Sequence, residues 1–264
     1  MSIIKKLLIV SIMLGVFILI LNTSSFAADS VSSFDVQNGV LVKYTGADTV
    51  LNIPPNSGII AIGKMAFSYR KDLISVTIPE GVTSIGDYAF SYCSGLTSIV
   101  LPSSVTSIGE CVFYNCSGLT AITIPDSVTR LGRNSFSITA ISKPILINDG
   151  KILCYVPKEY TSYVIPDTVS TINEGAFIDC QNLSSVIIPS SVTSIGDWAF
   201  SDCKSLTAVS IPSSVTSIGD CAFSGCKSLT AVSIPSRVTS IGDNAFYNCK
   251  RLNCFRCYER CRRN

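Results

Sequence analysis

The chain has 264 residues, of which 47% are hydrophobic and 14% are charged, and it contains no histidine. This composition argues against a disordered chain and allows one large or two small domains with a core. Without histidine, Ser-His-Asp and Cys-His catalytic groups, His-ligated zinc and imidazole proton shuttles are excluded, so any catalysis would depend on carboxylates, Cys, Lys or Tyr.

The N-terminal residues are organised like a secretory signal peptide. Lys5 and Lys6 precede an apolar run that ends at Leu21, and Ser25 and Ala27 occupy the two small-residue positions before a cleavage site. The apolar run is short for a membrane span, which needs ~20 residues, so we expect cleavage after Ala27 rather than an uncleaved anchor. The mature chain is therefore expected to have no stable membrane span and to be secreted or displayed at the cell surface.

Two residue types recur every 23 positions along most of the chain. The recurring phenylalanines are Phe67, Phe90, Phe113, Phe136, Phe177, Phe200, Phe223 and Phe246. The recurring prolines are Pro79, Pro102, Pro125, Pro166, Pro189, Pro212 and Pro235. Units of this size cannot bury their own apolar side and must stack on their neighbours. The sequence therefore predicts a repeat solenoid with 23-residue units, mainly β.

The unit that begins at Leu206 indicates what each repeat forms. Val209 and Ile211 alternate with outward residues, which predicts a short strand, and Pro212 ends it because proline cannot donate to a strand ladder. Asp220 precedes the sequence Cys-Ala-Phe, which predicts a helix N-cap followed by a short helical turn. We therefore expect short parallel strands, stacked at ~4.8 Å, together with short helical turns.

The regular spacing is interrupted between Phe136 and Phe177 by a segment that resembles the start of the mature chain. The pairs Asn38-Gly39 and Asp149-Gly150 are two-residue hairpin signals between apolar runs, so each half is expected to begin with a hairpin. The expected parts are a signal peptide at 1–27, an N-terminal hairpin cap at 28–56, a first repeat block at 57–143, an inserted hairpin at 144–166, a second repeat block at 167–253 and an atypical Cys/Arg-rich tail at 254–264.

The unit Leu-x-x-Val-x-Ile-Pro-Ser-Ser-Val-Thr-Ser-Ile-Gly-Asp-x-Ala-Phe-x-x-Cys resembles the BspA-type, treponemal-class leucine-rich repeat, over about residues 34–253. Members of that family are mostly exported or surface proteins of bacteria, with others in certain protozoa, and several are associated with adhesion. The resemblance implies a leucine-rich solenoid with a binding role, no catalytic residues and no cofactor. Ser142 departs from the pattern at a Leu position, and Arg70 and Thr139 depart from it at Cys positions.

Cysteines form a column three residues after the repeat phenylalanine: Cys93, Cys116, Cys180, Cys203, Cys226 and Cys249. Leucine-rich repeats use such columns to fill the core or to satisfy loop backbone, and free Cys behaves as a small buried hydrophobe. We expect buried thiols rather than disulfides, because an in-register column points every sulfur the same way. Cys111 and Cys221 lie in a more variable column, which indicates exposure, so we expect them to be the more reactive thiols.

Acidic residues recur three positions before the phenylalanine: Asp87, Glu110, Glu174, Asp197, Asp220 and Asp243. Such a row is compatible with a calcium ladder or with a carboxylate pair for glycoside hydrolysis. Capping of the expected helical turns explains all of them without a ligand. We therefore expect no metal, no cofactor and no enzyme, with a carboxylate hydrolase as a competing hypothesis.

The exposed strand positions carry small side chains and lack the aromatic and arginine anchors of strong interaction sites. The better candidates for ligand contact are aromatic residues near the turns, which we expect to gather on another edge. These candidates are Tyr69, Tyr88, Tyr92, Tyr114, Trp198 and Tyr247. The competing interpretation is ordinary surface decoration.

The C-terminal residues stop following the repeat after Leu252. Four cysteines here could bind zinc or form disulfides, and the arginines could contact phosphate or anionic lipid: Cys249, Cys254, Cys257 and Cys261. A second hypothesis is a frameshift, because the bases encoding Leu252 to Cys254 can be read in another frame as Leu-Thr-Ala. An uncapped last repeat would favour self-association through the C-terminal end.

These observations together predict a secreted or cell-surface leucine-rich-repeat protein that acts as a non-enzymatic protein- or glycan-binding module in adhesion to host or other cells. Its expected partners are extracellular or host proteins or glycans. Removal of Lys5 and Lys6 from the 20 basic residues leaves 18 against 18 acidic ones, so the mature chain offers no basic footprint for nucleic acid. The alternative is a structural or truncated repeat protein without a specific ligand.

Overall fold

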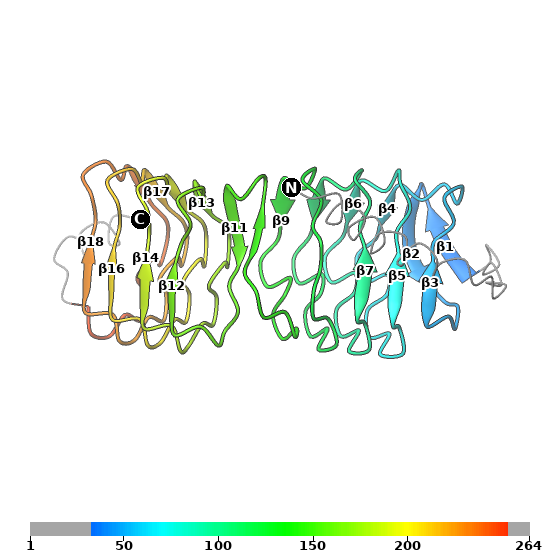
Figure 1. The fold of residues 1–264 in the computed structure, drawn as a ribbon, viewed down its shortest axis with the longest axis horizontal. Coiled ribbons are helices and arrows are strands. Elements are labelled where there is room, and N and C mark those ends of the chain that lie inside the picture. Colours follow the sequence, from blue (N-terminus) through cyan, green and yellow to red (C-terminus); the bar gives the residue numbers. More distant parts are fainter. Residues whose placement is uncertain (1–32, 253–264) are drawn as a thin grey trace, which may run out of the picture. The chain divides into compact units, whose positions relative to one another are not determined.

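The computed structural model describes residues 33–252, which fall within one compact unit. The expected signal peptide at 1–27 and the tail at 254–264 lie outside the described residues. The described chain winds as a β-solenoid whose turns repeat every 23 residues (Figure 1). This arrangement confirms the predicted repeat solenoid.

One side of the solenoid carries two ladders of very short strands. The first ladder contains β1 (Phe34–Gln37), β2 (Val40–Tyr44), β4 (Ala61–Ile62), β6 (Ser84–Ile85), β8 (Ser107–Ile108) and β9 (Arg130–Leu131). The second contains β10 (Ile145–Ile147), β11 (Ile152–Tyr155), β13 (Thr171–Ile172), β15 (Ser194–Ile195), β17 (Ser217–Ile218) and β19 (Ser240–Ile241). After each opening hairpin the strands pair parallel and in register, for example Ile195 with Ile218, so equivalent residues form columns.

The strands that precede the repeat prolines form three smaller parallel sheets. These sheets are β3 (Val50–Asn52), β5 (Ser75–Thr77) and β7 (Ser98–Val100); β12 (Ser162–Val164) and β14 (Ser185–Ile187); and β16 (Ala208–Ser210) and β18 (Ala231–Ser233). In β16 the middle residue, Val209, is buried while its two neighbours are exposed, as the alternation in the sequence predicts.

The two predicted hairpins are present. Strands β1 and β2 are antiparallel around a two-residue turn at Asn38 and Gly39, both of which have positive φ. Strands β10 and β11 are also antiparallel, but Ile147 pairs with Ile152, so their loop spans residues 148–151 instead of the expected two. Left-handed backbone at Asn148, Asp149 and Gly150 accommodates this longer loop.

Phenylalanine rings form the centre of the core. Phe67 and Phe90 stack with ring centroids 4.9 Å apart, and Phe200 and Phe223 stack at 5.0 Å. Hairpin tyrosines continue the column, because Tyr44 contacts Phe67 at 5.6 Å. Each hairpin therefore supplies an aromatic ring where a further repeat would supply phenylalanine.

The inserted hairpin separates two apolar cores. Ile145 and Ile147 belong to the core of the first block, whereas Leu153 belongs to the core of the second. Alternate side chains of a strand point to opposite faces, so one hairpin can contribute to both cores. The insertion thus covers the end of the first block and begins the second.

The expected helical turns are wrong: residues 33–252 contain no α-helix. In the turn around Phe200, the amides of Ala199, Ser201 and Cys203 donate to carbonyls three residues earlier in the same turn. The intervening amides of Trp198, Phe200 and Asp202 instead donate 2.7–2.8 Å hydrogen bonds to the next turn. Successive backbone amides thus donate alternately to a carbonyl of their own turn and to a carbonyl of the next turn. A continuous helix cannot form, because every second carbonyl accepts a hydrogen bond from a neighbouring turn.

A glycine precedes the acidic position in most turns because there is no room for a side chain. A β-carbon at Gly196 would lie 2.7 Å from the backbone nitrogen of Glu174 and 2.9 Å from the carbonyl carbon of Asn173. Similar backbone contacts surround Gly86 and Gly132. At the equivalent position after the insertion the chain has Asn173, so this column changes where the stacking is interrupted.

Candidate binding surface

The turns that contain the repeat phenylalanines form one edge of the solenoid, which we call the turn edge; Gly86–Cys93 is one such turn. Left-handed backbone recurs there two residues before and two residues after the phenylalanine, as at Tyr88 (φ 58°) and Tyr92 (φ 61°). Asn, Asp or Gly occupies many of these positions, as expected for this conformation. In the first block, however, several of them are tyrosines.

Two of these tyrosines, Tyr69 and Tyr92, contact each other along the turn edge, and Tyr114, which directly follows Phe113, contacts Tyr92. We call Tyr69, Tyr92 and Tyr114 the tyrosine row. The rings of Tyr69 and Tyr92 are stacked with centroids 4.6 Å apart, and Tyr114 meets Tyr92 edge-on at 5.6 Å. Tyr69 is 58% exposed, and Tyr92 and Tyr114 are half-buried. Burial raises the pKa of Tyr114 above its ordinary value, so its hydroxyl stays protonated at neutral pH.

The other three aromatic candidates lie outside the tyrosine row. Tyr88 occupies the other left-handed position of its turn, and the neighbouring thiol of Cys111 raises the pKa of its hydroxyl. Trp198 lies in the second block beneath the guanidinium of Arg133, which is 4.1 Å from the ring centroid. Tyr247 is 66% exposed in the last described turn. The role of all six residues as ligand contacts stays a prediction.

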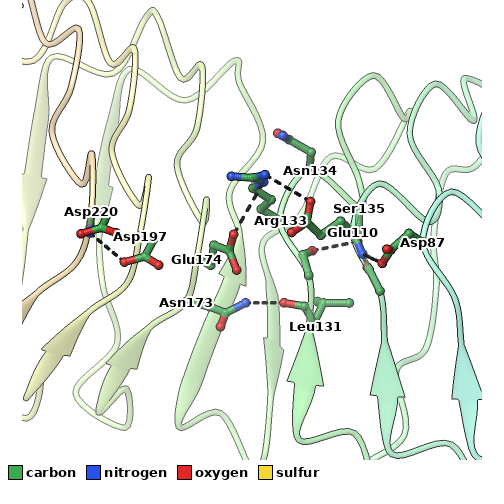
Figure 2. Close-up of polar contacts among 12 residues, drawn as sticks. Asp87, Glu110, Leu131, Arg133, Asn134, Ser135, Asn173, Glu174, Asp197 and Asp220 are labelled. Atoms are coloured by element: carbon green, nitrogen blue, oxygen red, sulfur yellow. Dashed lines mark hydrogen bonds and ion pairs between the residues drawn. The ribbon is translucent and has the colours of Figure 1, made fainter. Parts of the chain in front are cut away.

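Polar side chains join the two blocks beside the insertion (Figure 2). Arg133 forms ion pairs with Glu110 at 3.2 Å and with Glu174 at 3.6 Å. Asn173 donates a 2.7 Å hydrogen bond to the carbonyl of Leu131 in β9, the last strand of the first ladder. Burial raises the pKa of Glu174, although the positive charge of Arg133 opposes the shift. These contacts link the last turn of the first block to the first turn of the second block.

The acidic column caps the following turn rather than its own. The side-chain Oδ1 of Asp87 accepts a 2.9 Å hydrogen bond from the amide of Glu110. Asp197 and Asp220 accept 2.7 Å hydrogen bonds from the amides of Asp220 and Asp243, respectively. The predicted N-caps are therefore wrong, because no helix is present and the open amide belongs to the next turn. These contacts still explain three of the carboxylates without a ligand.

The cysteine column consists of free thiols, as predicted. Each sulfur contacts a backbone carbonyl of the preceding turn: Cys116 Sγ lies 3.1 Å from the oxygen of Phe90, and Cys203 Sγ lies 3.2 Å from that of Phe177. Five members are buried, whereas Cys249 is half-buried. Arg70, which replaces the cysteine in its turn, donates instead to the carbonyls of Gly46 and Asp48.

The prediction that Cys111 is an exposed, reactive thiol is wrong. Its exposed fraction is 8%, and burial raises its pKa. Cys221 is half-buried, and its pKa is raised by burial and by nearby carboxylates, with Asp220 first among them. The residues of this column share a left-handed backbone whether they are buried or not, so their variety does not report exposure. Both thiols are therefore less ionised than an ordinary cysteine.

Within residues 33–252, no group of three or more Cys, Asp or Glu side chains is arranged to hold a metal ion. The same described range holds no helix of the length and apolarity that a membrane span requires. Three cysteines of the predicted zinc or disulfide tail, Cys254, Cys257 and Cys261, lie outside the described residues.

The fold and its columns define the class of protein as a leucine-rich-repeat solenoid. The family model described as the BspA type leucine rich repeat region matches residues 43–153 and 150–263, with six copies. The chain therefore belongs to the BspA-type leucine-rich-repeat family, as its repeat unit predicted. No curated protein matches the chain.

Solved structures of bacterial leucine-rich-repeat proteins are similar to this chain. A protein from Eubacterium ventriosum is 25% identical, with 82% of this chain and 80% of that one covered and a TM-score of 0.51. The T. pallidum leucine rich repeat protein is 24% identical, with 88% and 94% covered and a TM-score of 0.41. A leucine rich cell surface protein from Faecalibacterium prausnitzii is 24% identical, with 83% and 91% covered and a TM-score of 0.40. The similarity to the Eubacterium ventriosum structure supports the solenoid fold.

Sequence reasoning missed the polar contacts at the insertion, although the repeat pattern contained a signal for them. Arg133 is a basic residue at a position where the preceding and following turns have Glu110 and Glu174, and Asn173 occupies a glycine position. Both departures fall on the turns that flank the insertion. Residues that depart from the repeat pattern, such as Arg133 and Asn173, thus mark the turns where the regular stacking is interrupted.

Proposed function

We propose that this protein is secreted or displayed at the cell surface and acts there as a non-enzymatic module that binds extracellular or host proteins or glycans, in adhesion to host or other cells. The observation that carries the proposal is the tyrosine row, an ordered set of aromatic side chains on the turn edge of the first block. The signal-peptide pattern before residue 28 supports export.

The tyrosine row has the physical properties of a contact surface. Tyrosine offers a large apolar ring with a hydrogen-bonding hydroxyl, and it loses little conformational entropy on binding because it has two side-chain torsions. Stacking between Tyr69 and Tyr92 restricts those torsions before a partner arrives. A partner would therefore meet a preorganised surface, which reduces the entropic cost of binding.

The non-enzymatic part of the proposal is supported by the contacts of the groups that could carry catalysis. The carboxylates of Asp197 and Asp220, which were the candidates for a hydrolytic pair, accept backbone hydrogen bonds from the next turn. The thiols of the cysteine column are occupied with backbone carbonyls. These groups have structural partners, so a chemical role is not needed to explain them.

The proposal is tested by measuring binding of the mature chain, residues 28–264, to arrays of extracellular-matrix proteins, mucins and glycans. Tyr92→Ala removes the central ring of the tyrosine row, and we expect it to weaken binding about tenfold, since one aromatic contact contributes ~1 kcal/mol or more. Ile187→Ala, which removes an exposed side chain of strand β14 that is not among the predicted contacts, is the matched control and should bind like the wild type.

Two outcomes would contradict this function. Equal binding by Tyr92→Ala and the wild type would remove the tyrosine row as the contact surface. The absence of saturable binding to every array would favour a structural repeat protein without a specific ligand. Light scattering on the same sample measures self-association, which we propose to involve the C-terminal end.

A further inference from the structure

The hydrogen-bonded backbone of the solenoid is interrupted beside the inserted hairpin. Between ordinary neighbouring turns, the amides of Trp198, Phe200 and Asp202 donate 2.7–2.8 Å hydrogen bonds from one turn to the next. Within the described part of the chain, no backbone hydrogen bond joins residues 33–143 to residues 144–252, and no sheet contains strands from both. We call these two ranges the first body and the second body. The ladder that fixes one turn on the next is therefore absent at the junction where the two bodies meet.

Apolar side chains hold the two bodies together. Ile145 and Ile147 of the inserted hairpin belong to the apolar core of the first body, which is separate from the core of the second. The ring of Phe136 contacts the ring of Tyr155 across the junction, with centroids 5.8 Å apart. Burial of apolar surface is favourable but has no preferred direction. These contacts therefore keep the bodies attached without fixing the angle between them.

Side chains supply the directional contacts across the junction (Figure 2). Asn173 in the second body donates a 2.7 Å hydrogen bond to the carbonyl of Leu131 in the first. Arg133 in the first body forms an ion pair with Glu174 at 3.6 Å, and its guanidinium lies 4.1 Å from the ring centroid of Trp198. One long side chain thus contacts two residues of the second body. Such contacts can open without breaking any backbone hydrogen bond.

A glycine gives Arg133 its path to Trp198. Gly175 lies two residues before Phe177, in the column where the turns on either side have Asn134 and Trp198. A β-carbon at Gly175 would lie 3.0 Å from the β-carbon of Arg133, so a larger side chain there would displace Arg133. Because Gly175 has no side chain, the guanidinium can extend past this turn to the ring of Trp198, one turn further on. The contact across the junction therefore depends on residues of both bodies.

We propose that the junction is a hinge between two separately cooperative bodies and that Arg133 is the latch that holds them in one orientation. In a solenoid, neighbouring turns unfold together only when the contacts between them are strong enough, and at this junction the inter-turn backbone hydrogen bonds are missing. When the latch opens, the guanidinium leaves the ring of Trp198 and uncovers this candidate contact residue. The proposal does not depend on the binding function of the tyrosine row, which lies within the first body.

Hydrogen exchange of the mature chain, residues 28–264, measured by mass spectrometry at increasing urea concentrations, tests the hinge. We expect peptides of the first body and peptides of the second body to exchange at rates that differ about tenfold or more, since each body opens alone. Trp198 is the single tryptophan of the chain, so its fluorescence reports on the latch. Quenching of this fluorescence by acrylamide should increase at urea concentrations at which both bodies still exchange slowly. One exchange rate for all peptides at every urea concentration would overturn the proposal.

Arg133→Ala tests the latch. Breaking a contact between two bodies destabilises only the body that unfolds first, because that contact is already lost when the other body unfolds. We therefore expect Arg133→Ala to lower the urea midpoint of the less stable body and to leave the other midpoint unchanged. Arg237→Ala, which removes an exposed arginine near the C-terminal end of the second body, is the matched control and should change neither midpoint. Equal shifts of both midpoints in Arg133→Ala, or no shift in either, would refute the role of Arg133 as the latch.

Discussion

Replacing Gly196 with alanine should destabilise the solenoid far more than its one added methyl group suggests. The new β-carbon would lie 2.7 Å from the nitrogen of Glu174 and 3.1 Å from the oxygen of Ile172, both of them backbone atoms. Ordinary van der Waals contact begins near 3.4 Å, so the two turns would have to separate by roughly half an ångström. That movement also stretches the 2.9 Å hydrogen bond from the Gly196 amide to Ile172.

The expected loss follows from these two effects. Overpacking against atoms that cannot rotate away costs about 1–3 kcal/mol, and weakening one backbone hydrogen bond adds about 1 kcal/mol. We therefore expect Gly196→Ala to lower the free energy of unfolding by about 3 kcal/mol. Urea denaturation followed by circular dichroism measures this loss through the shift in midpoint.

Asn173 offers the matched control because it occupies the same column one turn earlier and already has a β-carbon. Asn173→Ala removes the 2.7 Å hydrogen bond to Leu131 but introduces no new atom. Its expected cost is about 1 kcal/mol. If Gly196→Ala were no more destabilising than Asn173→Ala, the explanation of the glycine column by backbone proximity would be refuted.

Three further predictions concern single positions. Ile138 is β-branched, half exposed and held at φ 61°, a left-handed backbone that asparagine adopts more easily. Ile138→Asn should therefore raise the free energy of unfolding by about 1 kcal/mol, measured by thermal denaturation. The control Ile187→Asn changes an exposed isoleucine in strand β14 and should not stabilise the fold. Cys203→Ala removes a buried sulfur and its contact with Phe177, and an unchanged denaturation midpoint would contradict the expected cost of about 1–2 kcal/mol. Burial raises the pKa of the Glu174 carboxyl, so the folded chain binds its proton more tightly than the unfolded chain does, and ionisation of Glu174 lowers the free energy of unfolding. The free energy of unfolding of the wild type relative to Glu174→Gln should therefore fall as the pH rises above about 4.5. A difference that does not change with pH would show that the carboxyl is solvated.

Much of the candidate surface could be predicted one residue at a time but not as a set. The sequence identified Tyr69, Tyr92 and Tyr114 as aromatic residues near the turns, and the structure brings their rings into contact. It could not separate them from Trp198, because the guanidinium that lies over that ring belongs to Arg133, across the insertion. Contacts of this kind depend on how the chain crosses the interruption.

The sequence by itself determined the features that repeat locally or at a constant spacing. The 23-residue period predicted the solenoid, and the alternation around Val209 predicted a strand with one buried residue. The columns of phenylalanine and cysteine followed from the same period, since stacked units of equal length bring equivalent positions together. Asn38 and Gly39 predicted the first hairpin through their own backbone preferences.

Only the tertiary structure decided how the turns are built and what their polar groups do. The segment after Asp220 satisfies a local rule for a helix start, yet its amides are shared between its own turn and the next, which leaves no helix. Stacking also explains why the carboxylate of Asp197 accepts a hydrogen bond from the amide of Asp220 in the next turn. The variety of residues at the position of Cys111 did not predict that this side chain is buried. Hydrogen bonds between neighbouring turns outweigh the local preference, because each turn gains partners on both sides only when it is stacked.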